Sequence, residues 1–362
     1  MLLHRLWLTD FRSYDSAEVA FAPGLTAVLG ANGQGKTNLL EAIGYLATLG
    51  SFRGAPIDAL IRAGCSQAVI RAAGEREGRE LLIEAEVVPG GRSRVQVNRQ
   101  RLHRSRDLLG ALRVTVFAPD DLTLIKGGPA ERRRFLDDLL VALHPRHDAL
   151  RGDVERVLRQ RNALLKQCAG GSRFDESART TLDVWDAKLA ESGEALARAR
   201  VALVGQLEPA LRSAYASVAA QAGTDVRVRY EAPWLSQGLA SALAAARTDE
   251  LRRGVTLVGP HRDDLEIQLT DLPARTHASQ GEQRSLALAL RLAGHAVVTE
   301  STGTPPVLLL DDVFSELDPG RSDALLAHLP AGQTVLTSAV GLPPGALPEL
   351  VLHVDGSKVV DG

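Results

Sequence analysis

The sequence contains little cysteine, a single methionine and few aromatic residues. Its two cysteines, Cys65 and Cys168, lie far apart and lack the spacing of metal ligands. Such a pair is typical of a reduced chain, so we expect neither a disulfide framework nor a cysteine metal site. Aromatic residues make up only 4% of the chain, so leucine, valine and alanine must fill the core.

The sequence also lacks a membrane segment. No run reaches the roughly 18 apolar residues of a membrane-spanning helix. The N-terminal stretch MLLHRLWLTDFRSY does not have the basic-then-apolar order of a secretion signal. We therefore expect a soluble, cytoplasmic protein with no membrane partner.

Neither sign of charge is in excess. The net charge of −2 excludes a chain coated in positive charge but allows a local basic patch. Only five basic residues are lysine, and the other 37 of the 42 are arginine. GC-rich coding and phosphate recognition both produce this bias, so it does not decide between them.

The order of strand-like and helical stretches predicts the domain organisation, since 362 residues suffice for two or three domains. Apolar β-type runs near the start are followed by helical spacing from about residue 130 to 220, with leucines at every seventh position from Leu182 to Leu203 and a turn at 169–172. Strand-like runs then return at 256–259, 265–269, 307–310, 334–338 and 350–354. We expect an α/β head from residues 1–125 and 255–362, with a mixed sheet and a β-rich N-terminal lobe. Residues 126–254 are expected to form an inserted, all-helical arm built as a short antiparallel hairpin, although an ordinary bundle packed on the head explains them equally well.

A phosphate-binding loop is the strongest local signal. GANGQGKT at residues 30–37 matches G-x-x-x-x-G-K-[ST], after the apolar run LTAVL and before a helical pattern. Glycines allow backbone N–H groups to surround phosphate oxygens, Lys36 reaches the β- and γ-phosphates of ATP, and Thr37 holds Mg²⁺. The predicted nucleotide-binding residues are Gly30, Ala31, Asn32, Gly33, Gln34, Gly35, Lys36, Thr37 and Asn38.

A second pair of acidic residues fits the same chemistry. The run VLLL at 307–310 ends in Asp311 and Asp312, where a Walker B strand delivers a carboxylate to the nucleotide. Asp311 is predicted to belong to the Mg²⁺ site, and Asp312 is predicted to orient or deprotonate the attacking water. Lys36, Asp311 and Asp312 are thus the predicted catalytic residues, although aspartate is also frequent in turns at strand ends.

The stretch ASQGEQRSLALALRLA starts at Ala278 and lies before this strand. Ser279 and Glu282 have the spacing of a capping box, which by itself accounts for a helix start and nothing more. Ser315 and Asp318 follow the Walker B acids.

This order of motifs resembles the ATP-binding-cassette ATPases, and within them the SMC-like branch, where a helical insert interrupts the head. The insert is too short for a true SMC arm, and further stretches are similar to the RecF family of bacterial recombination mediators. These stretches are Phe11–Tyr14, Ser51–Arg53, Phe117–Leu122, Gly128–Pro129, Arg132–Asp137 and Gly259–Asp264.

The resemblance implies an ATP-dependent DNA clamp. Two subunits would associate head to tail, each capping the ATP of the other with its signature residues Ser279, Gln280, Gly281, Glu282 and Gln283, beside the D-loop residues Ser315 and Asp318. The family implies weak, DNA-dependent ATP hydrolysis that resets the clamp. It also implies binding to duplex DNA and single-strand/duplex junctions, and action with RecR and RecO to load RecA at gaps during DNA replication, recombination and repair.

Several positions depart from the wider cassette pattern. Gln280 stands where transporters have glycine, and Asp312 stands where glutamate is usual. No histidine follows TVLTS at 334–338, and no glutamine follows the strand at 114–117. Slow hydrolysis is consistent with these changes. The sequence does not identify the residue that senses the γ-phosphate.

Candidate DNA contacts are arginines in two stretches. Phosphate contacts require placed positive charge, so binding would be salt-dependent and largely independent of sequence. Because arginine is abundant in this chain, a solvated surface side chain is the simpler interpretation for any single one of them. The candidates are Arg99, Arg101, Arg104, Arg132, Arg133 and Arg134, with Arg92, Arg94 and Arg106 beside the first three.

Two other functions fit the nucleotide motifs. One is the ATPase subunit of a membrane transporter, which the helical insert and the Phe11–Tyr14 stretch disfavour. The other is a scaffold that binds ATP without hydrolysing it.

Overall fold

The computed structural model of the protein describes residues 1–90, 93–169, 175–219, 225–315 and 317–361. The chain forms two compact units: a head unit of residues 1–125, 210–225 and 277–362, and an arm unit of residues 126–209 and 226–276. The sequence-based boundaries placed 210–225 in the arm and 255–276 in the head, so these stretches are grouped differently in the structure. Arg92, Glu316 and positions 170–172 of the expected turn lie outside the described residues.

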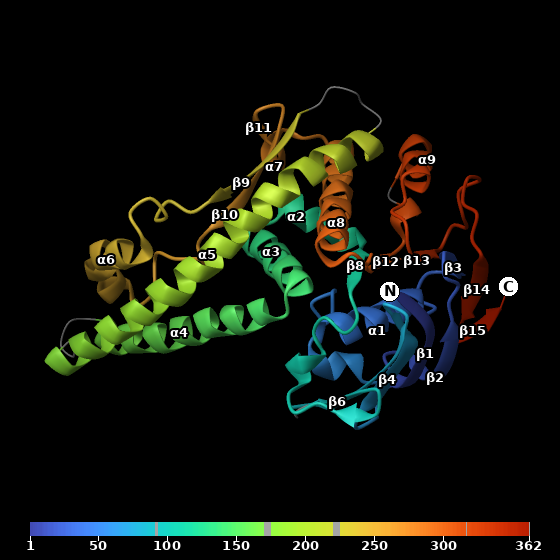
Figure 1. Cartoon of the computed structure of the whole chain (residues 1–362), viewed down its shortest axis with the longest axis horizontal. Helices are drawn as coiled ribbons and strands as arrows, with labels where there is room; N and C mark the ends of the chain where they lie inside the picture. The colour runs from blue at the N-terminus through green and yellow to red at the C-terminus, as the bar shows by residue number, and fades with distance from the viewer. Residues whose placement is uncertain (91–92, 170–174, 220–224, 316, 362) are drawn as a thin grey trace. The chain divides into compact units, whose positions relative to one another are not determined.

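A six-stranded sheet forms the centre of the head unit, in the order β15-β14-β3-β13-β12-β8. All neighbouring strands are parallel except β14 and β15. Because β3, from the start of the chain, lies between β13 and β14, from its end, both chain ends build one sheet, as expected (Figure 1). The strands are β3 (Leu25–Leu29), β8 (Val114–Phe117), β12 (Val307–Leu310), β13 (Thr334–Ser338), β14 (Leu350–Asp355) and β15 (Lys358–Asp361).

Three longer helices accompany this sheet: α1 (Lys36–Thr48), α8 (Gln280–Thr302) and α9 (Pro319–Ala327). Helix α1 contacts β8 and β13 as well as the N-terminal strands, and α8 contacts β8. All four residues of β12 are buried, which explains why its sequence is a continuous apolar run. Short helical turns complete the connections: η1 (Ile57–Leu60), η2 (Ser105–Leu108), η3 (Pro119–Leu122), α2 (Thr123–Lys126) and η4 (Val313–Ser315).

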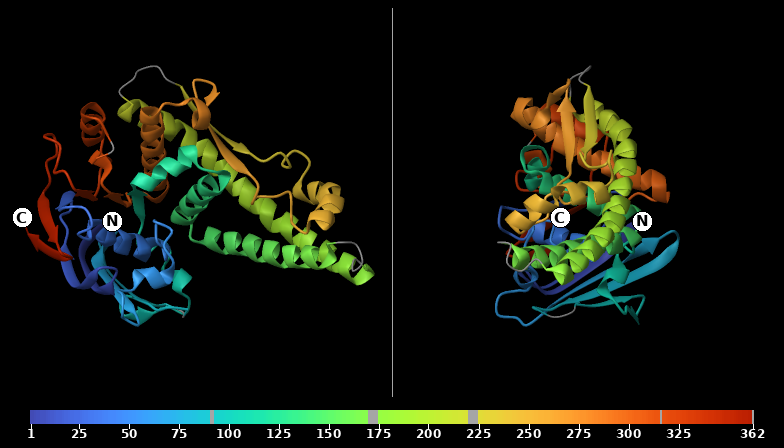
Figure 2. Two further views of the ribbon diagram at one scale, coloured as in Figure 1. Left: turned by 180° about the vertical axis from the view of Figure 1, so that it is seen from behind. Right: turned by 90° about the vertical axis from the view of Figure 1, so that its left-hand side faces the viewer.

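The predicted β-rich N-terminal lobe is an antiparallel sheet in the order β2-β1-β4-β5-β6-β7, seen as a separate layer in Figure 2. More buried and more exposed side chains alternate around the middle of β1, where Leu6 and Leu8 are at most 1% exposed, and Phe11 at its end is also fully buried. They join one hydrophobic cluster with α1. The strands are β1 (Leu2–Phe11), β2 (Tyr14–Ala20), β4 (Ala68–Arg76), β5 (Arg79–Val87), β6 (Arg94–Val97) and β7 (Gln100–Arg101).

Helices dominate the arm unit. Helices α4 and α5 run side by side (Figure 1), and the leucines of the seven-residue repeat on α5 are at most 2% exposed. Helix α5 contains Pro209, where its contacts change from the arm unit to the head unit. The helices are α3 (Pro129–Leu143), α4 (Arg146–Cys168), α5 (Glu176–Val218), α6 (Leu239–Arg253) and α7 (Ala274–His277).

The arm unit also contains a small antiparallel sheet, in the order β11-β10-β9. Strand β9 (Val226–Glu231) lies in the stretch expected to be helical, and its alternating sequence VRVRYE explains the strand. It pairs with β10 (Asp264–Leu269), which in turn pairs with β11 (Leu272–Pro273). This pairing holds residues 264–269 in the arm unit. Residues 256–259, which were expected to form a strand, lie in an irregular loop instead.

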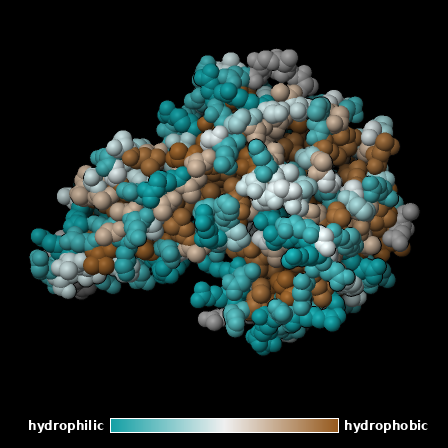
Figure 3. Space-filling model, viewed as in Figure 1, coloured by the Kyte–Doolittle hydropathy of each residue, from teal (hydrophilic) through white to brown (hydrophobic). Residues whose placement is uncertain are grey.

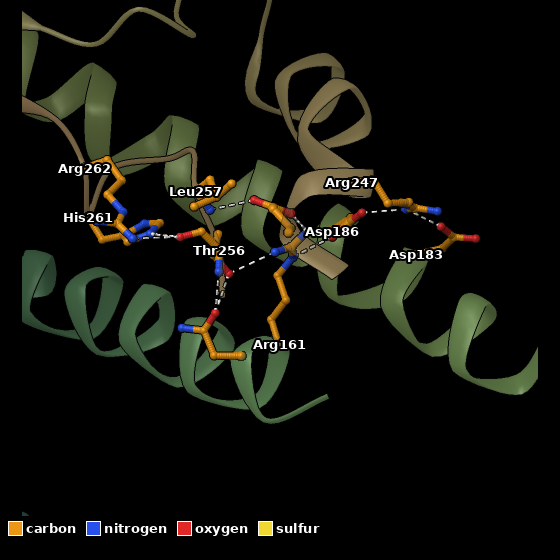
Figure 4. Close-up of polar contacts among 10 residues, drawn as sticks. Arg161, Asp183, Asp186, Arg247, Thr256, Leu257, His261 and Arg262 are labelled. Carbon is orange, nitrogen blue, oxygen red and sulfur yellow. Dashed lines mark hydrogen bonds and ion pairs between the residues drawn. The ribbon is translucent and has the colours of Figure 1, made fainter. Parts of the chain in front are cut away.

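One buried arginine links three parts of the arm unit (Figure 4). Arg161 on α4 is fully buried, and its Nε donates to Asp186 Oδ1 of α5 over 2.7 Å. Its Nη2 donates to Glu250 Oε2 of α6 over 2.6 Å, and its Nη1 donates to Thr256 Oγ1 over 2.9 Å. Arg247 adds a second bond to Asp186. The arginine thus ties two helices and the 254–263 loop to α4.

The stretch Gly259–Asp264 organises the same loop. His261 Nε2 lies 3.1 Å from the carbonyl oxygen of Thr256 (Figure 4), and burial lowers the pKa of His261 to about 4. Asp263 accepts hydrogen bonds from Tyr230 Oη at 2.6 Å and Trp234 Nε1 at 2.7 Å. The stretch Gly259–Asp264, one of those that resemble the RecF family, therefore has a structural role in the arm unit.

No described helix is both long and apolar enough to cross a bilayer. Hydrophilic residues predominate on the visible surface of the arm hairpin, at the left of Figure 3.

Candidate functional site

The loop between β3 and α1 has the backbone of a phosphate-binding loop. Gly30, Gly33 and Gly35 have φ angles of 155°, 81° and 111°, respectively, and helix α1 starts at Lys36. The loop therefore leads directly into a helix N-terminus, whose free N–H groups and positive dipole favour an anion. The Lys36 ammonium donates to the carbonyl oxygens of Gly30 at 2.7 Å and Ala31 at 2.9 Å.

Two of these glycines are required by close neighbours. A Cβ at Gly30 would lie 2.3 Å from the carbonyl oxygen of Val354, and one at Gly35 would lie 2.9 Å from Tyr14 Oη. Both positions also have φ angles that side chains disfavour. A side chain at either position would therefore strain this loop path.

Asp311 lies directly beside the start of α1. Its Oδ1 accepts hydrogen bonds from Thr37 Oγ1 at 2.9 Å and Thr337 Oγ1 at 2.8 Å. The sheet order explains this meeting, because β3, β13 and β12 are parallel neighbours whose carboxyl ends share one edge. The structure thus brings together the two predicted Mg²⁺ ligands. From the sequence, Thr337 was noted only as an occupant of the region where cassettes often have a histidine, and no contact with Asp311 was predicted for it.

Burial shifts the pKa values of two charged groups at this site, Asp311 and Lys36. Desolvation raises the pKa of Asp311, and the hydrogen bonds from Thr337 and Thr37 act in the opposite direction. Desolvation likewise lowers the pKa of Lys36, while the nearby charges of Asp312 and Asp311 raise it. Burial thus disfavours the charged form of both groups, and pKa values perturbed in this way are common at functional sites.

These residues fit ATP with Mg²⁺. The loop N–H groups and Lys36 suit phosphate oxygens, and the Thr37 hydroxyl and Asp311 carboxylate are oxygen donors of the kind Mg²⁺ takes. Among the described residues, no group of three or more His, Cys, Asp or Glu could hold a metal. Mg²⁺ at nucleotide sites needs no such group, because phosphates and waters supply most of its ligands.

Asp312 is held in an unusual backbone conformation. Its φ is 47°, in the left-handed region that aspartate visits more easily than most residues. Its backbone N–H donates to Thr337 Oγ1 at 3.0 Å, and its Oδ1 accepts from the backbone N–H of Ala339 at 3.3 Å. The segment after β13, where cassettes often have a histidine, thus positions the second acid.

The loop is supported by stretches whose role the sequence did not reveal. Tyr14 Oη donates to the carbonyl oxygen of Gly35 at 3.1 Å, and Asn38 Nδ2 donates to Ser13 Oγ at 2.9 Å. Arg12 makes two bonds of 2.7 and 2.6 Å to the buried carboxylate of Glu41 on α1, which also accepts from Ser51 Oγ. The stretches Phe11–Tyr14 and Ser51–Arg53 therefore brace the nucleotide loop and its helix.

The turn between β14 and β15 holds the middle of the loop. The backbone N–H of Gly356 donates to Gln34 Oε1 at 2.6 Å, and the backbone N–H of Ser357 donates to the Gln34 carbonyl oxygen at 3.2 Å. The C-terminal strands thus have a direct part in shaping the site. The sequence offered no signal for this contact.

The predicted capping box is present at the start of α8. Ser279 Oγ accepts from the Glu282 backbone N–H at 3.3 Å, and Glu282 Oε2 accepts from the Ser279 backbone N–H at 2.7 Å. These bonds lower the pKa of Glu282. Gln283 is buried and donates to the carbonyl oxygen of Ala278, while Ser279 and Gln280 are exposed. Among the described residues, no hydrogen bond or ion pair joins Ser279–Gln283 to the Gly30–Asn38 loop.

The D-loop candidates follow the Walker B strand. Ser315 Oγ donates to the carbonyl oxygen of Asp312 at 2.8 Å. Asp318 caps helix α9, with its Oδ1 accepting from the Arg321 backbone N–H at 3.0 Å. Sequence reasoning did not single out Arg321, although its position three residues after Asp318 was a usable signal for an ion pair.

The arginines predicted to contact DNA divide into two sets. In the head unit Arg99, Arg101, Arg104 and Arg106 are exposed along β7 and its flanking turns, close in sequence to Arg94 of β6. This edge of the lobe carries more basic than acidic residues between 94 and 107. This exposure is compatible with the predicted phosphate contacts.

The second set lies on α3 in the arm unit. Arg132 donates twice to the Asp264 carboxylate, at 2.8 Å each, and its side chain is 6% exposed. That burial is incompatible with the predicted phosphate contact, because the guanidinium is already paired and covered. Arg133 donates to the carbonyl oxygen of Asp263 and is half-buried, whereas Arg134 is 63% exposed.

Comparison with known proteins adds independent evidence. A family model described as RecF/RecN/SMC N terminal domain matches residues 2–336. The DNA replication and repair protein RecF of Streptomyces avermitilis is 48% identical over 353 residues, covering 94% of this chain and 93% of that protein. A solved structure of the recombination mediator protein RecF with ATP, from the RecFOR pathway, has a TM-score of 0.91 at 27% identity and covers 100% of this chain and 97% of that one. The Smc head domain of Pyrococcus furiosus, bound to part of ScpA, shares the fold, with a TM-score of 0.58 at 20% identity over 99% of this chain and 96% of that one.

The fold and the family match define an ATPase head of the SMC-like class: a P-loop sheet built from both chain ends and interrupted by a largely helical insert. The family match and the RecF relative narrow this class. This chain belongs to the RecF family.

Proposed function

We propose that this chain is an ATP-dependent DNA-binding clamp of recombinational repair. The contact of Thr37 with Asp311, braced by Thr337, carries the nucleotide part of the proposal. It places the two predicted Mg²⁺ ligands within one hydrogen bond of each other at the start of α1. The RecF proteins it resembles are described as DNA replication and repair proteins, and one is solved with ATP.

Each residue of the site has a proposed part in ATP hydrolysis. The loop N–H groups and Lys36 hold the phosphates, and Thr37 and Asp311 hold Mg²⁺. Bound Mg²⁺ neutralises charge on the phosphate oxygens. Asp312 orients or deprotonates the attacking water, from a backbone position that Thr337 and Ala339 fix. Because aspartate is shorter than the usual glutamate, we expect slow turnover that acts as a switch.

The signature residues Ser279–Gln283 are proposed to act on the ATP of a second copy. Ser279 and Gln280 are exposed at the N-terminus of α8, which suits an anion. A partner's ATP is such an anion, so association would depend on nucleotide, and C₂ symmetry would complete both sites together. Ser315 and Asp318 are proposed to lie at the same interface.

DNA is the proposed partner of the dimer, as duplex or as a single-strand/duplex junction. Exposed Arg99, Arg101, Arg104 and Arg134 are the proposed phosphate contacts. The RecFOR pathway of the solved RecF supports RecR and RecO as further partners, with loading of RecA at gaps as the outcome.

Sedimentation of the purified full chain tests this function. With Mg²⁺, we expect monomers without ATP, dimers with ATP, and dimer–DNA complexes when a short gapped duplex is added. ATP turnover should rise when DNA is present, and DNA affinity should fall steeply with salt. If the oligomeric state is the same with and without ATP, the proposed ATP-dependent clamp is wrong. If DNA does not change the rate of ATP turnover, the proposed DNA-dependent hydrolysis is wrong.

Replacing Arg99 and Arg101 by glutamate locates the DNA surface. The change should weaken DNA binding and reduce the slope of log affinity against log salt by roughly 0.9 for each lost phosphate contact. The matched control is Arg252→Glu, an exposed arginine of the arm unit. If both variants lose the same DNA affinity, β7 is not the DNA-binding surface.

A further inference from the structure

One side chain joins the D-loop candidate to the signature candidate within the same subunit. Arg321 lies in the first turn of α9, where its Nη1 donates to Asp318 Oδ2 at 2.5 Å. Its backbone N–H also donates to Asp318 Oδ1. The N-cap residue of α9 therefore holds Arg321 at both its backbone and its guanidinium.

The guanidinium of Arg321 lies against Gly281 in the first turn of α8. A Cβ at Gly281 would stand 2.9 Å from both Nη1 and Nη2, and 3.2 Å from Cζ. Gly281 is helical and its φ is not in the left-handed region, so backbone conformation does not require glycine here. Its absence of a side chain instead leaves room for the guanidinium, which a Cβ would displace.

The charges around this contact are arranged to retain it. A guanidinium near a helix N-terminus opposes the helix dipole, and two carboxylates offset that cost: Asp318, through the ion pair, and Glu282, whose pKa Arg321 helps to lower. Tyr215 of α5 borders the same cluster; burial raises its pKa to about 12, with opposing contributions from Glu282 and Arg321. Arg321 Nε is buried and has no hydrogen-bond partner among the described residues. The pair with Asp318 and the space over Gly281 thus set where the guanidinium lies.

We propose that Arg321 is a positioning residue that couples the D-loop to the signature stretch. It fixes the start of α8, with Ser279, relative to Asp318, so that both segments reach a partner-bound ATP as one unit. This inference rests on the proposed ATP-dependent dimer. It assigns Gly281 a role within its own subunit, which is to leave room for Arg321.

Two substitutions should disturb this contact in the same way. Arg321→Ala removes the guanidinium, and Gly281→Ala displaces it without requiring the backbone to move. Each should weaken ATP-dependent dimerisation by about tenfold, as expected for residues in direct contact. The double variant should lose about tenfold as well, and not a hundredfold, because the second change removes nothing further. Arg321→Lys keeps the charge but has no planar group to lie on Gly281, so it should lose less than Arg321→Ala.

The measurement is the dimer dissociation constant from sedimentation with ATP and Mg²⁺, beside binding of a fluorescent ATP analogue to the monomer. Monomer binding should stay within about twofold of the parent, because the subunit's own phosphate loop is intact. Arg252→Ala is the matched control. Arg252 forms an ion pair with Asp249, three residues before it, as Arg321 does with Asp318, but on an exposed surface. This variant should leave dimerisation unchanged.

The outcomes separate this inference from the proposed function. A parent chain that stays monomeric with ATP would overturn both. A parent that dimerises with ATP, while Arg321→Ala dimerises equally well, would overturn only the coupling. Losses that multiply in the double variant would show that Gly281 acts independently of Arg321, and would also overturn it.

Discussion

Thr37 Oγ1 donates a hydrogen bond to Asp311 Oδ1 over 2.9 Å, across 274 residues of sequence. The contact exists because β3 and β12 are both neighbours of β13 in one parallel sheet. It joins the first helix of the chain to one of its last strands at the proposed Mg²⁺ site. The insert between them can therefore form a separate unit without separating the two halves of the site.

Lys36→Met should abolish useful ATP binding. The variant removes the only charged group that the loop offers to the phosphates, and hydrogen bonds to charged groups are each worth enough to lower affinity by about a hundredfold. Titration with a fluorescent ATP analogue measures the loss. Lys126→Met, at an exposed lysine, is the control and should bind normally. Tight binding by Lys36→Met would remove Lys36 from the site.

Ser279→Arg should separate ATP binding from dimerisation. The bulky cation replaces the exposed N-cap of α8 and opposes the approach of a second subunit, while the phosphate loop of its own subunit is unchanged. Loss of the cap should also cost about 1 kcal/mol of stability. Light scattering with ATP measures dimers, and Ser301→Arg, near the other end of α8, serves as the control. Normal dimers with Ser279→Arg would exclude the proposed trans capping.

Asp312→Asn should keep ATP bound and slow its hydrolysis by about a hundredfold, the range of a lost general base. The amide retains the acceptor for Ala339 but cannot take a proton. Dimers formed with ATP should therefore persist, as followed by sedimentation over time. Asp323→Asn, at an exposed position of α9, should turn over ATP like the parent. Rapid hydrolysis by Asp312→Asn would assign the catalytic role elsewhere.

Arg161→Met should destabilise the arm unit by about 3–5 kcal/mol, because it leaves the carboxylates of Asp186 and Glu250 without their buried partner. Urea unfolding followed by tryptophan fluorescence is suitable, since two of the three tryptophans, Trp185 and Trp234, belong to the arm unit.

Arg156→Met on the same helix is the control for Arg161→Met. The Arg156 side chain is 64% exposed in a pair with Asp153, so its loss should cost less than about 1 kcal/mol. Similar losses in the two variants would contradict a special role for the buried network.

Acid should destabilise the fold through two buried histidines. Burial lowers the pKa of His261 and of His295 to about 4, from an ordinary value of 6.5. Between these values the unfolded chain binds protons that the folded chain does not, so stability falls as the pH is lowered from about 6.5 towards 4. Each histidine should account for about 2 kcal/mol between pH 7 and pH 5.

His295→Gln tests this pH dependence. Its free energy of unfolding should fall less than that of the parent between pH 7 and pH 5, whereas exposed His353→Gln should behave like the parent. An unchanged pH dependence in His295→Gln would show that His295 does not contribute to the acid sensitivity.

Local patterns were sufficient for the elements of the nucleotide site. The glycines and Lys36 between an apolar run and a helical pattern predicted the loop and its helix, and the structure has both. The Ser279–Glu282 spacing predicted a capping box that is present. These predictions succeed because they depend on contacts within a few residues, where backbone geometry alone decides what is possible.

Arginine side chains show where local patterns stop. Arg132, Arg133 and Arg134 are adjacent and chemically identical in sequence, yet one is buried against Asp264, one is half-buried and one is exposed. Only the packing of α3 against β10 distinguishes them. Similarly, a strand formed at Val226–Glu231 because β10 was available as a partner.

The sequence alone determined the phosphate loop, the acidic end of β12 and the presence of a helical insert, since each is written in consecutive residues. Only the tertiary structure decided that Thr337 completes the bonds to Asp311, that Gly356 holds Gln34, and that Arg321 occupies the space over Gly281. These contacts join residues on different elements. Their distances follow from strand order and helix packing, which are collective properties of the folded chain.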